Sequence, residues 1–141
     1  MDERAPSDET AVVNLLDRLH DAAARADGPA YFDTYTADAI FIGTDASERW
    51  TMDEFRAYAR PAFEAGRGWT YAAVERHVRV AAGGDVAWFD ERLENAKYGD
   101  CRGSGVCVRT ADGWRVAHYV LSFPVPNDAA AAVVELIRAS D

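Results

Sequence analysis

The chain has 141 residues, of which 15 are Lys or Arg and 24 are Asp or Glu, so its formal net charge at pH 7 is −9. This length suits one domain with a sizeable core, and the acidic balance argues against nucleic acid or an anionic membrane as a partner, since both bind clustered positive charge. No apolar run approaches the ~20 residues of a membrane span, and the acidic, polar start is not typical of a signal peptide. We therefore expect a cytoplasmic protein with a single domain over residues 1–141.

The cysteine and histidine spacings give no sign of a metal site. The sequence has no Cys-x-x-Cys or His-Glu-x-x-His motif, which are common zinc-ligand spacings. Its two cysteines, Cys101 and Cys107, fall in one predicted strand, where six residues span ~20 Å. That separation is beyond the reach of a disulfide. We expect two free thiols, no bound metal and no cofactor.

Helical signals dominate the first half of the chain. Ser7 or Asp8 caps a first helix, and its apolar stripe recurs at helical spacing at Val12, Leu15, Leu16, Leu19 and Ala23. Gly28-Pro29 starts a short second helix, since Pro suits a first helical turn. Thr51 and Glu54 match a capping box, which predicts the start of a third helix.

Strand signals dominate the second half. After a short strand at 39–42, four runs rich in β-branched and aromatic residues are separated by Gly-containing turns, at 69–81, 86–96, 101–109 and 114–123. Links this short force neighbouring strands to be antiparallel. A final helix is expected at 128–141, so the core of the domain spans about 8–127. This order of elements indicates an α+β fold.

The last two strands carry the most distinctive pattern of the chain. They read Gly-x-Gly-Val over 103–106 and Asp-Gly-Trp-x-Val-x-x-Tyr-x-Leu-Ser over 112–122. This hairpin resembles the end of SnoaL-like domains in the nuclear-transport-factor-2-like superfamily, which includes the ketosteroid isomerases. The resemblance implies a cystatin-like cone of curved, mainly antiparallel sheet, with N-terminal helices packed over a concave pocket. It also implies a homodimer built on the opposite face of the sheet.

The hairpin loops predict which residues lie opposite one another. A symmetric loop between the first two long strands places His77 opposite Asp90 and aligns two further pairs of opposite charge, which favours this register. A four-residue loop before the third strand places Asp90 beside Cys107. The last hairpin then places Gly105 beside Tyr119, if no strand contains a bulge.

The two predicted faces of the sheet differ in character. One mixes aromatic, small and ionisable residues, as a pocket lining does, and comprises His77, Trp88, Asp90, Arg92, Gly103, Gly105, Cys107, Tyr119 and Leu121. The other is mostly apolar and β-branched, and comprises Val78, Phe89, Leu93, Val106, Val108, Val116, His118 and Val120. We expect the first face to line the pocket and the second to form the homodimer interface; alternatively, the second face covers the first helix.

The candidate site residues follow from the pocket face. A carboxylate beside an imidazole can orient it and raise its pKa, so Asp90 and His77 are a candidate acid–base pair, with Tyr119 as a hydrogen-bond donor to a carbonyl. Alternatively, Asp90 and His77 form a salt bridge that sets the register. Trp88 and Tyr119 either stack on a flat ligand or pack in the core. The predicted ligand-binding set is Trp88, Tyr119, Arg92, Tyr58 and Trp69.

The resemblance implies a fold more strongly than a reaction. Ketosteroid isomerases use an aspartate at the end of the first strand and a tyrosine on the first helix, and Gly43 and Leu19 stand at the matching positions here. The main hypothesis is therefore a protein that binds a small, partly apolar organic molecule in the pocket. One alternative is an isomerase, cyclase or hydratase with Asp90 as its base. Another is an assembly module whose pocket is plugged by Trp88 and Trp69.

Overall fold

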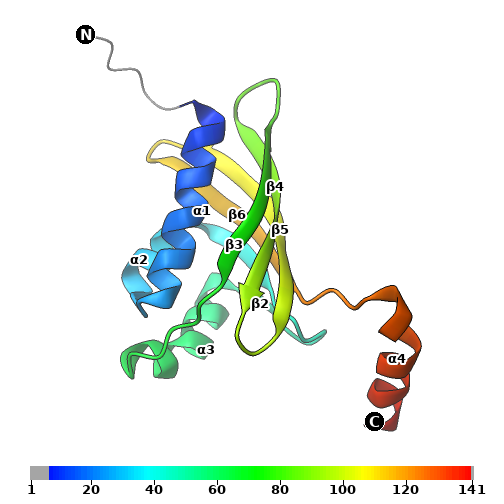
Figure 1. The fold of residues 1–141 in the computed structure, drawn as a ribbon. Helices are drawn as coiled ribbons and strands as arrows, with labels where there is room; N and C mark the ends of the chain where they lie inside the picture. Colours follow the sequence, from blue (N-terminus) through cyan, green and yellow to red (C-terminus); the bar gives the residue numbers. More distant parts are fainter. Residues whose placement is uncertain (1–6, 141) are drawn as a thin grey trace.

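The computed structural model describes residues 7–140, in which a six-stranded sheet is flanked by helices (Figure 1). The helices are α1 (Asp8–Ala24), α2 (Gly28–Asp33), α3 (Met52–Glu64) and α4 (Ala130–Ala139), the last preceded by a 3-10 turn at Asn127–Ala129. The strands are β1 (Tyr35–Ile42), β2 (Arg49–Thr51), β3 (Ala72–Val80), β4 (Val86–Asn95), β5 (Gly99–Thr110) and β6 (Gly113–Ser122). This architecture confirms the predicted α+β class and the C-terminal helix.

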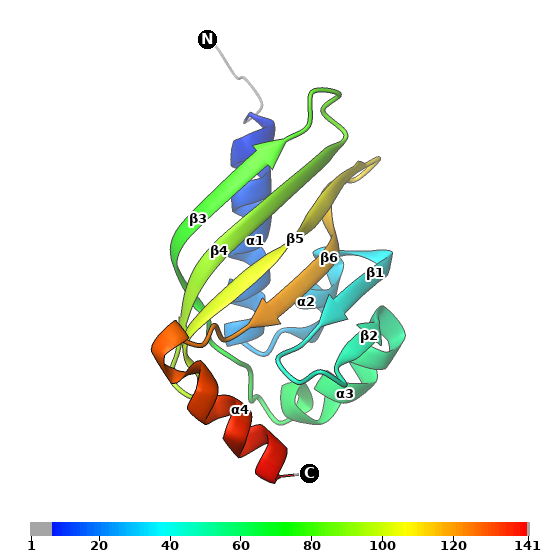
Figure 2. The ribbon, with the colours of Figure 1, turned by 90° about the vertical axis from the view of Figure 1, so that its right-hand side faces the viewer.

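The sheet curls around the N-terminal helices. Its strand order is β2-β1-β6-β5-β4-β3, with β1 parallel to β6 and every other neighbouring pair antiparallel. Helices α1, α2 and α3 cover one face, called the inner face below, whereas α4 lies on the side of the opposite, outer face (Figures 1 and 2). The core fills the space between the inner face and these three helices.

The local signals that start the helices act as the sequence predicts. Ser7 caps α1, and its side chain accepts a hydrogen bond from the backbone N–H of Thr10. The capping box of α3 is complete, because the side chains of Thr51 and Glu54 each accept a hydrogen bond from the other's backbone N–H. Among residues 7–140, no helix is both long enough and apolar enough to cross a bilayer.

The register of β3 against β4 is the predicted one, with His77 opposite Asp90. The register of β4 against β5 is not, because Asp90 lies opposite Ser104 instead of Cys107. The actual loop is tighter than predicted: Asn95 pairs with Gly99, and the Asn95 side chain accepts hydrogen bonds from the two backbone N–H groups of residues 97 and 98. Since side chains alternate along a strand, an odd shift moves every residue of β3 and β4 to the other face.

Several predicted face assignments are therefore wrong. Four residues expected on the pocket face lie exposed on the outer face, namely His77, Trp88, Asp90 and Arg92. Two residues of β4 expected on the interface side are buried in the interior instead, namely Phe89 and Leu93. The last hairpin does pair Gly105 with Tyr119, but an irregularity after Val106 turns Val116 into the core.

The two cysteines lie on one strand, as expected. Both Cys101 and Cys107 belong to β5, both are buried, and both are free thiols. Burial raises the pKa of the Cys107 thiol to about 12, so the group behaves as a small apolar side chain.

Candidate functional site

A buried carboxylate network joins α1 to the inner face. Glu91 of β4 is 1 % exposed, and its Oε2 atom accepts hydrogen bonds from His20 Nε2 at 2.6 Å and from the Tyr119 hydroxyl at 2.7 Å. Its Oε1 atom accepts a hydrogen bond from Arg76 Nε at 2.8 Å, and Arg76 Nη1 donates to Asp17 at 2.7 Å. Helix α1 is thus held to β3, β4 and β6 by one set of charges.

The backbone makes room for this network at Gly103. A Cβ atom at that position would collide with the Tyr119 hydroxyl and would lie 3.2 Å from Glu91 Oε2. Asp17 and His20 are one helical turn apart on α1, so both side chains point to the same part of the sheet. The Gly-x-Gly pattern of β5 therefore serves close packing on this face.

The network sets the protonation of its members. Burial raises the pKa of Glu91, but the contacts with His20, Tyr119 and Arg76 outweigh it and hold that pKa below its usual value of 4.5. Burial beside the Glu91 charge raises the pKa of Tyr119 well above 10. Glu91 is therefore an anion and Tyr119 a neutral donor near pH 7, and both carboxylate oxygens are already engaged.

A separate aromatic cavity lies beside this network on the inner face. Its volume is about 140 Å³, and its lining comprises Phe41, Gly43, Thr44, Glu48, Trp50, Phe55, Tyr58, Trp69, Tyr71, Tyr98 and Leu121. These residues come from β1, the loop 43–48, β2, α3, the segment before β3, the β4–β5 turn and β6. The cavity is thus assembled from parts of the chain that are distant in sequence.

Two local features place the indole rings of the cavity. Trp50 precedes the Thr51 cap and packs on Phe55, with ring centroids 5.4 Å apart, which is the hydrophobic staple expected before this capping box. Trp69 follows Gly68, where a Cβ atom would collide with the carbonyl oxygen of Ala23, and the Trp69 backbone N–H donates to that oxygen at 3.1 Å. The end of α1 therefore anchors one wall of the cavity.

The loop 43–48 brings a carboxylate to the cavity. Gly43 N donates to Glu48 O at 2.8 Å, and Asp45 N donates to Glu48 Oε1 at 2.9 Å. A Cβ atom at Gly43 would lie 2.7 Å from Glu48 Oε1, so glycine permits the side chain of Glu48 to fold back. Within residues 7–140, Glu48 forms no ion pair with Lys, Arg or His.

Three tyrosine hydroxyls at the cavity have no protein partner among the described residues, namely those of Tyr58, Tyr71 and Tyr98. Burial, together with the nearby Cys101, Tyr98 and Glu48, raises the pKa of Tyr71 to about 12. The Tyr71 hydroxyl therefore keeps its proton at neutral pH and is available both to donate and to accept.

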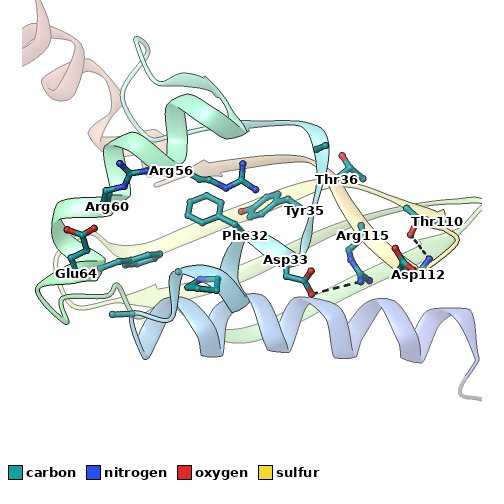
Figure 3. A pocket seen from close by; sticks show the side chains of 15 residues that line it. Phe32, Asp33, Tyr35, Thr36, Arg56, Arg60, Glu64, Thr110, Asp112 and Arg115 are labelled. Atoms are coloured by element: carbon teal, nitrogen blue, oxygen red, sulfur yellow. Dashed lines mark hydrogen bonds and ion pairs between the residues drawn. The ribbon is translucent and has the colours of Figure 1, made fainter.

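A larger hollow of about 850 Å³ lies on another side of the protein, between α2, α3, the start of β1 and the β5–β6 hairpin (Figure 3). Two of its three basic residues already have neighbours: Arg115 lies 4.0 Å from Asp33, and Arg56 lies over the ring of Phe32 and 3.5 Å from Asp53. The third, Arg60, forms no ion pair within residues 7–140. Acidic and basic residues are balanced in the lining of this broad hollow, so it is a weaker candidate for a ligand-binding site than the aromatic cavity.

The predicted site residues divide between the two faces. Tyr58 and Trp69 line the cavity, and Tyr119 lies on the same face, stacked on Phe41 at 5.8 Å with its hydroxyl bound to Glu91. His77, Asp90, Trp88 and Arg92 are on the outer face, where His77 is 3.8 Å from Glu75. His77 and Asp90 are paired across the hairpin as predicted, but with Trp88 they line a separate open hollow of about 680 Å³ instead of the cavity under the helices.

Sequence reasoning missed other residues of the site. It did not select His20, Glu48, Tyr71, Tyr98 or Glu91. The opposite charges of Arg76 and Glu91 at one register were visible in the sequence, and with the correct loop they point to a buried charge pair. Among residues 7–140 there is no cluster of His, Cys, Asp or Glu arranged to hold a metal ion.

Comparison with known proteins defines the family. A model of the SnoaL-like domain matches residues 12–126. The chain belongs to the SnoaL-like domain family. No curated protein matches the sequence.

Solved structures of the nuclear-transport-factor-2-like superfamily share the fold of this SnoaL-like domain. An NTF2-like protein of unknown function from Pseudomonas putida is 17% identical, with a TM-score of 0.70, over 86% of this chain and 89% of its own. A protein of unknown function with a cystatin-like fold from Nostoc punctiforme is 14% identical, with a TM-score of 0.70, over 87% and 96%. A protein provisionally named a dehydratase of the NTF2-like family, from Streptomyces avermitilis, is 17% identical, with a TM-score of 0.70, over 85% and 98%. At these identities the likeness shows the cone fold alone.

Proposed function

We propose that this SnoaL-like protein binds a small, partly apolar organic molecule in the aromatic cavity. The observation that carries the proposal is the set of three tyrosine hydroxyls, at Tyr58, Tyr71 and Tyr98, that meet at a cavity without protein partners. The side chains of Tyr71 and Tyr98 are partly buried, whereas Tyr58 is exposed at the rim. Hydroxyls that have no protein partner at a cavity can donate to and accept from a ligand.

The size and walls of the cavity restrict the ligand. A cavity of roughly 150 Å³ admits a molecule of the size of benzene, and this one has a volume of about 140 Å³. Aromatic walls favour an apolar or polarisable group, while the hydroxyls fix one polar atom. Anything larger extends into the adjoining groove, which shares Trp69, Tyr71 and Tyr98 with the cavity.

The geometry does not support Asp90 or Glu91 as an acid–base group at the cavity. Asp90, the expected base, is exposed on the outer face. Glu91 is inside, but it does not line the cavity, and its two oxygens are occupied by His20, Tyr119 and Arg76. A general base must reach its substrate within hydrogen-bond distance.

A cavity-filling variant tests the proposal. We expect Leu121→Trp to abolish the thermal stabilisation that phenol, cyclohexanone and choline chloride each provide to the parent protein in a melting assay, because a ligand that binds the folded state raises its melting temperature. Val74→Trp, at an exposed position of β3 outside the cavity, is the matched control and should leave the stabilisation unchanged. The proposal fails if none of the three probes stabilises the parent, or if Leu121→Trp is stabilised as much as the parent.

We also propose that the outer face forms a homodimer. The central strands of this face carry apolar side chains, namely Ile40, Trp88, Val106, Val108 and Val120. Val116 was expected in this set but is buried in the core. Helix α4 lies on the same side, has no buried residue and exposes Leu136 and Ile137 (Figure 2). Such apolar surface is typical of an interface.

Light scattering tests the proposed dimer. We expect the parent protein to have twice the mass of the 15.5 kDa chain and Val106→Asp to have the monomer mass. A parent protein at the monomer mass would contradict the proposal.

A further inference from the structure

The charge at the aromatic cavity is of one sign. Of the eleven residues that line it, seven are aromatic and one, Glu48, is acidic. The lining contains no Lys or Arg. Within the lining itself, a cationic ligand would therefore find a counter-charge and an anionic ligand would not.

The Glu48 carboxylate is half-buried and is available to such a ligand. Its Oε1 atom accepts one hydrogen bond, from Asp45 N at 2.9 Å, and no hydrogen bond to Oε2 is formed by any residue from 7 to 140. The Oε2 atom of Glu48 is therefore free to pair with a bound cation.

The rings around Glu48 suit a cation that lacks hydrogen-bond donors. The electron-rich faces of Trp and Tyr attract organic cations, and alkylated ammonium groups are the ones typically held by several aromatic rings. The walls here include Trp50 and Tyr58, with ring centroids 4.3 Å apart, and Trp69. One ring of this cavity already holds a cation, since Lys97 Nζ lies 5.1 Å from the ring centroid of Tyr98.

We propose that the ligand of the cavity is an organic cation, with a tertiary or quaternary alkylammonium group placed among the aromatic rings and paired with Glu48. This inference rests on the proposed function, because it names the chemical class of the molecule that the cavity binds. The remainder of the cation lies in the adjoining groove, whose lining carries Glu94 and Asp100 against one Lys97 and so is also acidic on balance.

Choline and its neutral isostere, 3,3-dimethylbutan-1-ol, separate charge from shape. We expect isothermal titration calorimetry to show that choline binds at least tenfold more tightly than the isostere, with tetramethylammonium close to choline. Glu48→Gln keeps an oxygen for the Asp45 N–H but loses the charge, and we expect it to weaken choline about tenfold and the isostere less than twofold. The control is Glu75→Gln on β3, which is exposed and away from the cavity, and it should change neither.

The outcomes distinguish the two proposals. Equal affinities for choline and the isostere, both lost in Leu121→Trp, overturn the cation inference and leave the binding function standing. Choline binding that Glu48→Gln does not weaken, in a variant that melts at the parent's temperature, also overturns the inference. If neither choline, nor tetramethylammonium, nor the isostere, nor the neutral probes named above bind, both proposals fall.

Discussion

The Glu91 network and the aromatic cavity lie on the same inner face, yet they treat their polar groups in opposite ways. In the network, one carboxylate receives three side-chain donors, from α1, β3 and β6. In the cavity, the hydroxyls of Tyr58, Tyr71 and Tyr98 receive none from residues 7–140. The comparison teaches that a buried ionisable group with every partner inside the protein is part of the architecture, whereas polar groups left without partners around a void are suited to a ligand.

Removal of the Glu91 carboxylate is the strongest test of whether the Glu91 network stabilises the fold. We expect Glu91→Leu to lower the free energy of unfolding by about 3–5 kcal/mol, because Arg76 would remain nearly buried without its inner partner. Urea denaturation measures this change. The matched control is Glu94→Leu on the same strand, which is exposed on the outer face and should change stability by less than about 0.5 kcal/mol. Equal effects at the two positions would show that the network does not hold α1 in place.

A methyl group at Gly103 tests the same network through its geometry. We expect Gly103→Ala to lower the free energy of unfolding by about 1–3 kcal/mol, since the new Cβ would displace the Tyr119 hydroxyl and leave a buried hydrogen bond unmade. In a Tyr119→Phe background the same substitution should have a smaller effect, because the colliding oxygen is gone. Additive losses in the double variant would separate Gly103 from the network.

The pH dependence of stability gives a third test, of intermediate size. The pKa of Glu91 is lowered in the folded protein from 4.5, so at pH values below 4.5 the unfolded chain takes up this proton before the folded one does. The contribution of Glu91 is therefore fully present above pH 4.5 and is lost as the pH falls through the folded pKa. We expect the stability difference between the parent and Glu91→Gln to shrink as the pH falls below 4.5. A difference that does not change between pH 7 and pH 3 would contradict the lowered pKa.

The cavity should show the smallest effects on stability. Because the Tyr71 hydroxyl has no partner among residues 7–140, we expect Tyr71→Phe to change the free energy of unfolding by less than about 0.5 kcal/mol. The same variant should bind choline more weakly in calorimetry if this hydroxyl contacts the ligand. Asp90→Asn on the outer face should be equally neutral for stability and should leave binding unchanged. A decrease of more than about 1 kcal/mol in the free energy of unfolding of Tyr71→Phe would show that the hydroxyl has a partner inside the protein and a structural role.

The candidate site was only partly predictable from the sequence. The sequence predicts Trp69 and Tyr58 as ligand contacts, and both line the cavity. The sequence does not predict Glu48 as a site residue, because its position depends on how the loop folds back at Gly43. It does not predict Tyr98 either, because Tyr98 lies in a turn. Neither residue has a local signal, since each acquires its neighbours only when β2, α3 and the β4–β5 turn meet.

The sequence by itself determined the elements, the pairing of β3 with β4 and the pairing in part of the β5–β6 hairpin. Capping residues start α1 and α3, opposite charges set His77 against Asp90, and the last hairpin pairs Gly105 with Tyr119. These signals are local, so they survive in any tertiary arrangement.

Only the tertiary structure decided which face of β3 and β4 is inside. The link expected as a loop over 97–100 closes as a tighter turn, with Gly99 at a φ of 72° and Asn95 binding two backbone N–H groups. The resulting shift of β4 against β5 turns Asp90 outward and Glu91 inward. Side chains alternate between the two faces with a period of two, so the length of one turn decides which face each side chain of β3 and β4 occupies. The burial of Glu91 beside His20 of α1 favours the observed register.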